Sequence, residues 1–141
     1  MAKKKVFVSF DYDNDKHYKN LLAAWDANPN FEFKFSDKSP HEINSGNVGR
    51  VKAALTNKIN DATYTLVLIG KYANKEHPDS RLINDINWIN WEINKSKELG
   101  KKLVAVKLDR GNESPTAIMG VGAKWAMSFT QESIIKALKD A

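Results

Sequence analysis

Short hydrophobic runs alternate along the chain with segments in which hydrophobic residues recur every three or four positions. The run YTLVLI at 64–69 is continuously apolar, which is typical of a strand covered on both faces. The run FEFKF at 31–35 alternates aromatic and charged residues, which indicates a half-exposed strand. The pattern predicts five strands, at 6–10, 31–35, 64–69, 103–108 and 124–129.

Helical spacing of hydrophobic residues follows each of these runs, and Asp15 is the predicted N-cap of the first helix. A regular alternation of strands and helices favours a parallel sheet with helices on both faces. We therefore expect one flavodoxin-like α/β domain over residues 1–141, with strand order 2-1-3-4-5. The predicted helices are 15–27, 48–59, a long helix that includes 82–96, and 131–139.

Ligands of such folds bind beyond the carboxyl ends of the strands, so the loops at that edge are the first place to look for a site. These loops are 11–15, 36–46, 70–84 and 109–123.

The composition narrows the chemistry that these loops can perform. The chain has no cysteine, which excludes disulfides, thiolate metal sites and cysteine nucleophiles and fits a reducing, cytoplasmic setting. Its three histidines are scattered, so we expect no metal site. The net charge is +5, but the lysines are dispersed and lack interleaved aromatic residues, so we expect no nucleic-acid binding. The longest apolar run is too short to span a membrane.

The segment WINWE at 88–92 is the most unusual stretch of the predicted long helix. At 100° per residue, a hydrophobic stripe of Leu82, Ile86, Ile89 and Ile93 faces the sheet. Glu92 then lies at the edge of that stripe, roughly 90° away, and Trp88 lies one turn earlier on the same side. A glutamate against an indole is partly desolvated, which raises its pKa.

Trp91 is predicted on the side of the helix opposite the stripe, roughly 170° from it. The core of the domain would then leave it uncovered. We expect it to contact either another chain or the loop 70–84.

Four segments together resemble the TIR-domain family, and in particular the bacterial TIR-like proteins of Thoeris antiphage defence. VFVSFDYDND at 6–15 resembles the first TIR box, and FSDKSPHEINSG at 35–46 resembles the loop after the second strand, although Ser36 replaces the usual arginine. KWAMSF at 124–129 resembles the late Phe-Trp box, with Trp125 alone. The most specific match is WINWE, which fits the Trp-x-x-x-Glu pattern of TIR enzymes that cleave NAD.

The resemblance implies that Glu92 is catalytic and that NAD is the substrate, with no further cofactor. The product would be an ADP-ribose-derived signal, cyclic, linear or conjugated. The implied partners are a separate effector protein that binds this signal, a phage component as trigger, and other copies of the chain.

Five further residues are candidates for substrate binding because of where they fall. Ser9, Phe10 and Asp11 end the first strand, although Phe10 can equally be plain core. Asp37 can contact a ribose or cap its loop. Trp88 can be a stacking wall or pack under a loop.

Three other functions compete with NAD cleavage. A receiver domain needs an aspartate at the end of the third strand, where this chain has Ile-Gly-Lys at 69–71. A flavodoxin needs a Ser/Thr/Gly-rich phosphate loop after the first strand, where this chain has DYDND. A TIR-like module that acts by assembly alone, without catalysis, is the alternative that the sequence leaves open.

Overall fold

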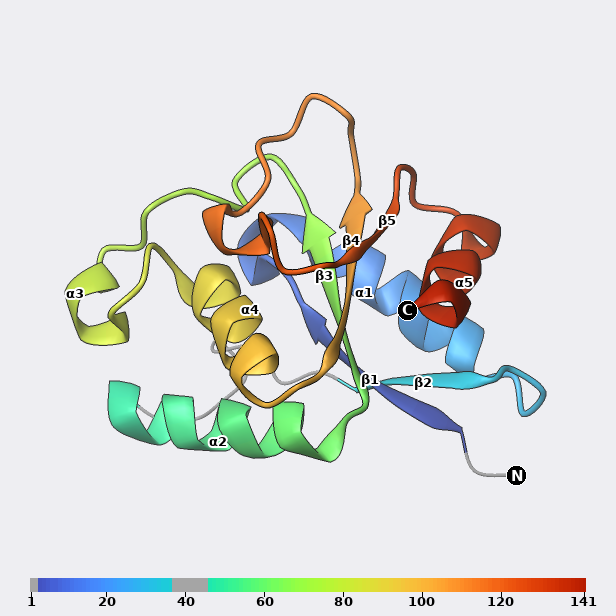
Figure 1. Ribbon diagram of the computed structural model, residues 1–141, viewed down its shortest axis with the longest axis horizontal. Coiled ribbons are helices and arrows are strands. Elements are labelled where there is room, and N and C mark those ends of the chain that lie inside the picture. Colours follow the sequence, from blue (N-terminus) through green and yellow to red (C-terminus); the bar gives the residue numbers. More distant parts are fainter. Residues whose placement is uncertain (1–2, 37–45) are drawn as a thin grey trace.

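The computed structural model describes residues 3–36 and 46–141, which contain one parallel sheet flanked by helices (Figure 1). The strand order is β2-β1-β3-β4-β5, as the sequence predicts. The strands are β1 (Lys4–Ser9), β2 (Phe33–Ser36), β3 (Tyr64–Ile69), β4 (Lys102–Lys107) and β5 (Lys124–Ala126).

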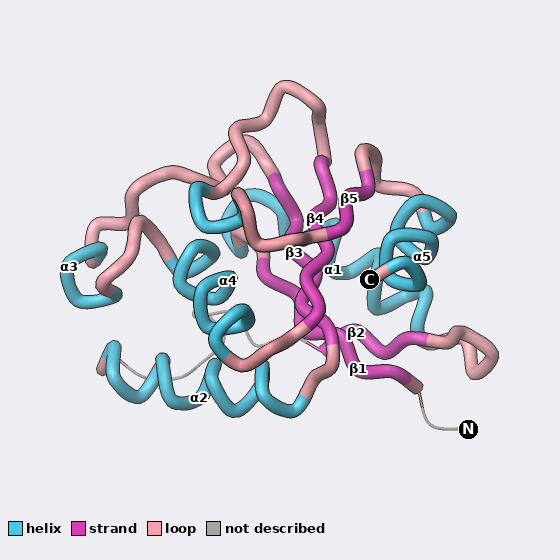
Figure 2. The backbone as a smooth tube through the Cα atoms, viewed as in Figure 1, coloured by secondary structure: helices cyan, strands magenta, loops and turns pink. Residues whose placement is uncertain are grey.

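The long helices cover both faces of this sheet, which confirms the predicted flavodoxin-like class (Figure 2). One face carries α1 (Tyr12–Asp26) and α5 (Gln131–Asp140), and the other carries α2 (Val48–Asp61) and α4 (Trp88–Glu98), with the shorter helices α3 (Ser80–Ile83) and η2 (Thr116–Ile118). One face has one hydrophobic cluster, beneath α1 and α5, and the other face has two, beneath α4 and α2.

The alternation of side chains along β3 explains its unbroken apolar sequence. Leu66 and Leu68 pack in the cluster beneath α1 and α5, whereas Val67 and Ile69 pack in the cluster beneath α4. All six residues of β3 are buried. A strand with helices on both sides must be apolar at every position, and β3 meets that requirement.

The prediction of one long helix is wrong, because the helix is interrupted between α3 and α4. Asn84 adopts the left-handed conformation, with φ of 62°, and ends α3 after a single turn. Asn87 then caps a new helix by accepting a hydrogen bond from the backbone N–H of Asn90 at 2.9 Å. Leu82, which the predicted stripe placed in the core, is 64% exposed as a result.

Candidate functional site

A cleft of about 710 Å³ opens beyond the carboxyl ends of the strands, where the strand order reverses between β1 and β3. Four segments form its walls: the start of α1, the start of α2, the loop after β3 and the start of α4. The lining residues are Phe10–Asn14, Gly46, Val48, Val51, Tyr72, Lys75–Asp79 and Asn87–Ile89.

Glu92 lies directly behind this cleft and not on its surface. Its side chain is one helical turn beyond the lining residues Trp88 and Ile89, and the residue is only 2% exposed. Ser9, which precedes the lining residue Phe10, donates a hydrogen bond from Oγ to Glu92 Oε1 at 2.6 Å. The predicted position of Glu92 at the rim of the core is therefore wrong, and Ser9 contacts Glu92 instead of lining the cleft.

Burial raises the pKa of Glu92 to about 8, and the hydrogen bond from Ser9 opposes that rise. A carboxylate removed from water loses its hydration, which favours the neutral form. Burial therefore favours the neutral form of the Glu92 carboxyl. A positive charge brought next to it would favour the ionised form.

The helix break explains why Glu92 is buried. Because α4 starts at Trp88, Leu82 and Ile86 are not part of it. The helix therefore need not turn the face that continues their stripe toward the sheet. The buried side of α4 carries Ile89 and Ile93, together with three polar residues, Asn90, Glu92 and Ser96. Ser96 bonds to Thr65 on β3 at 2.7 Å, so both Glu92 and Ser96 have partners in the sheet.

Trp91 does not point away from the core, so that prediction is wrong as well. Trp88 and Trp91 both pack against the cluster between the sheet and α2, which includes Phe7, Val51 and Leu55. The two indole rings meet edge to face, with centroids 5.7 Å apart. Trp91 is half-buried because α2 packs over it.

The prediction that Asp15 is the N-cap of α1 is wrong. Asp11 is the N-cap, accepting from the N–H of Asp13 at 3.1 Å, and it lines the cleft. Asp15 is 7% exposed, and its Oδ2 has no hydrogen-bond partner among the described residues. Burial and the nearby Asp11 raise the pKa of Asp15 to about 6, although His17 opposes this.

The remaining predicted site residues divide into two groups. Phe10 and Trp88 line the cleft, as does Asp11. Phe10 is only 4% exposed, so it serves as core and as cleft floor together. Asp37 lies outside the described residues.

The sequence places the loop 70–84 at the ligand-binding edge, but it singles out neither Tyr72 nor Lys75 of that loop, and it does not identify Asn87. The ring of Tyr72 lies within 5.5 Å of the Lys71 ammonium and 5.4 Å of the Lys75 ammonium. Asn87 could have been found, since an asparagine directly before an amphipathic helix is a recognised capping signal.

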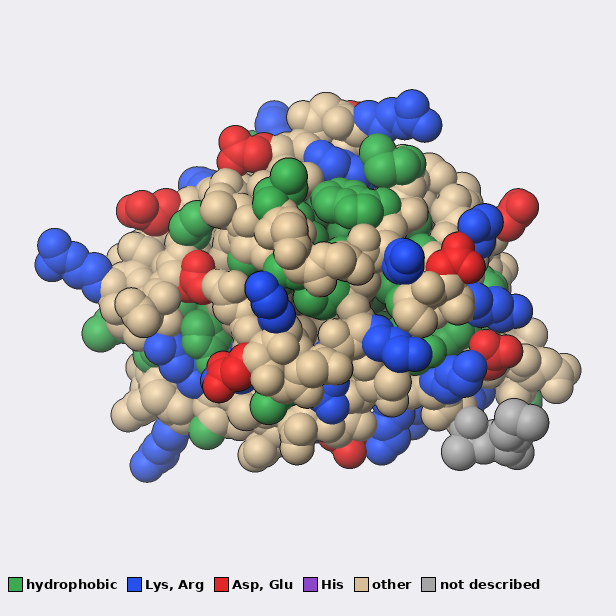
Figure 3. All heavy atoms as spheres, in the orientation of Figure 1, with side chains coloured by type: hydrophobic (Ala, Val, Ile, Leu, Met, Phe, Trp, Pro, Cys, Tyr) green, Lys and Arg blue, Asp and Glu red, His purple; other side chains and the backbone are tan. Residues whose placement is uncertain are grey.

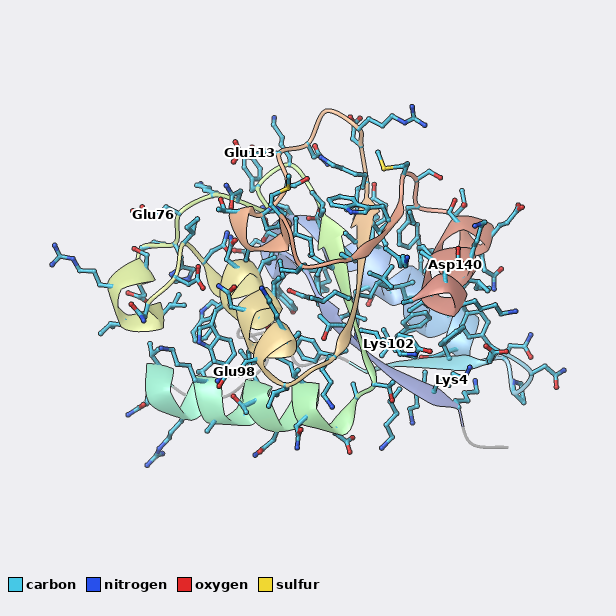
Figure 4. All side chains as sticks on the ribbon, viewed as in Figure 1. Lys4, Glu76, Glu98, Lys102, Glu113 and Asp140 are labelled. Carbon is cyan, nitrogen blue, oxygen red and sulfur yellow. The ribbon has the colours of Figure 1, made fainter. Side chains whose placement is uncertain are left out.

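The charges that line the cleft are mostly negative. Among the described residues, the start of α1 contributes Asp11 and Asp13 to the lining, and the loop after β3 contributes Glu76, Asp79 and Lys75. Glu76 is labelled in Figure 4. Elsewhere on the face in Figure 3, lysine and arginine side chains are interspersed with acidic ones. The described residues hold no cluster of three or more potential metal ligands from histidine, aspartate and glutamate, and none of their helices is long and apolar enough to cross a membrane.

The sheet order and the cleft at its reversal point define a flavodoxin-like α/β domain with a cleft at its carboxyl edge. Within that class, the chain belongs to the TIR-like domain family of the Thoeris protein ThsB, whose family model matches residues 7–113. No curated protein matches the sequence.

Two solved structures share the fold at low sequence identity. One is a 2-deoxyribosyltransferase from Bacillus psychrosaccharolyticus, with 15% identity, a TM-score of 0.58, and coverage of 92% of this chain and 90% of that one. The other is a 2-desoxiribosyltransferase from Leishmania mexicana, with 13% identity, a TM-score of 0.60, and 97% of each chain covered.

Proposed function

We propose that this protein is a Thoeris antiphage enzyme that cleaves NAD at the bond between nicotinamide and ribose. The product is an ADP-ribose-derived signalling nucleotide, cyclic, linear or conjugated, which a separate effector protein binds. The observation that carries the proposal is the buried carboxyl of Glu92, held by Ser9 immediately behind an aromatic-walled cleft.

The cleft suits the parts of NAD. The oxidised nicotinamide ring is cationic and flat, so carboxylates and aromatic side chains such as Tyr12 and Trp88 favour its binding. The two phosphates repel carboxylates and favour ammonium groups. They therefore lie toward the loop that carries Lys75, next to Tyr72.

The reaction breaks the bond between ribose C1′ and the nicotinamide nitrogen. The bonding electron pair leaves with nicotinamide, which becomes neutral and needs no acid catalyst. Positive charge develops on the ribose, and the Glu92 carboxylate stabilises it. Attack at C1′ by water, by the adenine of the same molecule or by another acceptor, with loss of a proton, completes the reaction.

The protonation state of Glu92 makes this chemistry dependent on substrate. Burial favours the neutral acid, since it raises the pKa of Glu92. A cationic nicotinamide-ribose beside the group lowers that pKa and generates the carboxylate that the reaction needs. The carboxyl must also gain access to the cleft, and we assign that step to the phage-derived trigger.

The solved structures with this fold support the reaction class. Both are named as deoxyribosyltransferases, enzymes that move a sugar. Cleavage of the nicotinamide-ribose bond is likewise a reaction at a sugar. The fold is shared at 15% and 13% identity, so it supports the architecture of the site and no individual residue.

The test compares Glu92→Gln with Glu98→Gln in cells challenged with phage. Glu98 is on the same helix, is exposed and pairs with Lys95 at 2.9 Å, so its variant controls for loss of a glutamate from α4 (Figure 4). We expect mass spectrometry to detect nicotinamide and the signal nucleotide with Glu98→Gln but not with Glu92→Gln. Equal product from both variants would rule out the proposed role of Glu92.

A second candidate function is a non-catalytic TIR-like module that acts by assembly with copies of itself. The observation that favours it is the 2% exposure of Glu92, which lies outside the lining of the cleft. In that case Glu92→Gln would retain full protection against phage, with no NAD consumed by either variant.

A further inference from the structure

Buried asparagines join α4 to the two loops beside it. Asn90 is fully buried, and its Nδ2 donates to Asn74 Oδ1 and to Asn87 Oδ1, each at 3.0 Å. Its Oδ1 accepts from the backbone N–H of Ala117 at 2.8 Å. Each polar atom of this side chain is therefore bonded. A buried polar network with all its groups satisfied fixes the relative position of the segments that contribute to it.

Asn87 is the member of this network that reaches the cleft. Its Nδ2 donates to the carbonyl oxygens of Ala73 and Lys75, both at 2.9 Å. Its Oδ1 accepts from the N–H of Asn90 and thereby caps α4. One side chain thus fastens the loop after β3 to the first turn of the helix that carries Glu92.

The part of that loop nearest these bonds, residues 72–75, gives the cleft one aromatic and one basic side chain, Tyr72 and Lys75. Lys75 accepts the Asn87 bond on its carbonyl, and its ammonium lies over the ring of Tyr72. A separate bond, from His77 N–H to the Ile86 carbonyl at 2.8 Å, joins a later part of the loop to the segment before α4. Asn87 therefore sets the distance between α4 and the part of the wall that holds Tyr72 and Lys75.

We propose that Asn87 is a positioning residue that sets the affinity of the cleft for the diphosphate of a dinucleotide, by holding the Tyr72–Lys75 wall against α4. This inference rests on the proposed function. Asn87 touches the loop backbone and the helix, and it acts on the substrate through Tyr72 and Lys75.

Two substitutions separate the capping role of Asn87 from the wall role. Asn87→Asp and Asn87→Ser both keep an oxygen that can cap α4, because aspartate and serine are favoured N-caps. Neither can donate from Nδ2 to the two loop carbonyls, and aspartate places a carboxylate against them. The matched control is Thr130→Asp. Thr130 is the N-cap of α5, away from the cleft, so this variant likewise places an aspartate at a helix N-cap.

The first measurement is amide hydrogen exchange in the full chain. We expect both Asn87 variants to exchange faster than the parent at residues 72–76, with residues 92–98 of α4 as protected as before. Thr130→Asp should leave both segments unchanged. Parent-like exchange at 72–76 in the Asn87 variants would overturn the proposal, whatever the substrate.

The second measurement is NAD affinity, followed by tryptophan fluorescence because Trp88 lines the cleft. We expect each Asn87 variant to bind NAD at least about fivefold more weakly, as loss of one to two hydrogen bonds implies. Where turnover is measured, KM should rise more than kcat falls. Faster exchange at 72–76 with parent-like affinity would also overturn the positioning role.

Failure of the proposed function gives a different pattern. If the parent binds NAD and the Asn87 variants lose affinity, but Glu92→Gln still makes product, then the catalytic assignment fails and the Asn87 assignment stands. If the parent does not bind NAD, both the function and the affinity role of Asn87 fail, and the exchange data report the structural link alone.

Discussion

Two carboxyl groups are buried on opposite faces of the sheet, Glu92 beneath α4 and Asp15 beneath α1. Glu92 accepts a hydrogen bond from Ser9, whereas Asp15 Oδ2 has no hydrogen-bond partner among the described residues and lies against Gly70. Burial raises the pKa of both, to about 8 for Glu92 and about 6 for Asp15. A raised pKa alone therefore does not identify the catalytic group that we propose, and the bond to Ser9, next to the cleft residue Phe10, distinguishes Glu92.

The largest expected effect is on activity. Glu92→Gln should lower NAD cleavage at least about 10³-fold, because it removes the charge that stabilises the ribose cation. Asp15→Asn, if it stays folded, should retain activity within about twofold, because Asp15 is not among the residues that line the cleft. Nicotinamide release by the two variants, measured side by side, checks this. Equal losses would mean that both carboxyls serve a structural role.

The dependence of stability on pH should distinguish the two carboxyl groups next. Each folded-state pKa lies above the unfolded value, so each native carboxyl binds a proton that the unfolded chain has released. Stability then falls as pH rises, from about 4.5 to 8 because of Glu92 and from about 3.8 to 6 because of Asp15.

Both amide substitutions should therefore stabilise the protein at high pH. Glu92→Gln should gain about 2–4 kcal/mol over the parent at pH 8, with little of that gain at pH 5. Asp15→Asn should gain about 1–2 kcal/mol, most of it already present at pH 6. Urea unfolding at pH 5, 6 and 8 checks both windows. A gain that is constant with pH would show that the carboxyls are not buried as described.

Gly70 gives a smaller effect that tests the packing around Asp15. A Cβ added at Gly70 would lie 1.9 Å from Asp15 Oδ2, so Gly70→Ala should cost about 1–3 kcal/mol of stability. Adding Asp15→Ala removes the clashing atoms and should restore most of the loss, which makes the pair non-additive. Thermal unfolding of the two single variants and the double variant measures this. An additive result would contradict the close contact.

The smallest expected effect comes from Ser9→Ala. The Ser9 hydroxyl lowers the pKa of Glu92, so its loss should move the acid limb of the pH–rate profile to higher pH. At neutral pH the loss of activity should be less than about tenfold, as for one hydrogen bond. Ser9→Thr keeps the hydroxyl and should leave the profile in place. An unchanged profile in Ser9→Ala would mean that the Ser9 bond does not persist in the reacting site.

The sequence predicts the sheet well, because the periodicity of hydrophobic residues along a strand shows which of its faces are buried. The apolar run of β3 and the alternating run FEFKF each have the environment that their pattern indicates: β3 is buried on both faces, and Glu32 and Lys34 are exposed beside buried phenylalanines. Strand order and the coverage of both faces follow from the regular alternation of strands and helices. The lining positions of Phe10, Asp11 and Trp88 also follow, because carboxyl ends of parallel strands share one edge.

The helix that carries Glu92 shows where the pattern fails. A hydrophobic stripe through Leu82, Ile86 and Ile89 is a correct reading of spacing, but it assumes one continuous helix. Asn84 and Asn87 end one helix and begin another, and that shifts the buried side of α4. Asparagine tolerates both the left-handed conformation and the N-cap, so its presence permits a break without requiring one.

The sequence by itself determined the type and order of the elements, the sheet and the edge at which the cleft lies. Only the tertiary structure decided that Glu92 is buried, that Ser9 is its partner 83 residues away and that α2 covers Trp91. The periodicity of hydrophobic residues identifies the apolar face of each helix and strand, because an apolar face must be buried. The environment of a polar side chain depends on which distant segments pack against it, and no local pattern encodes that.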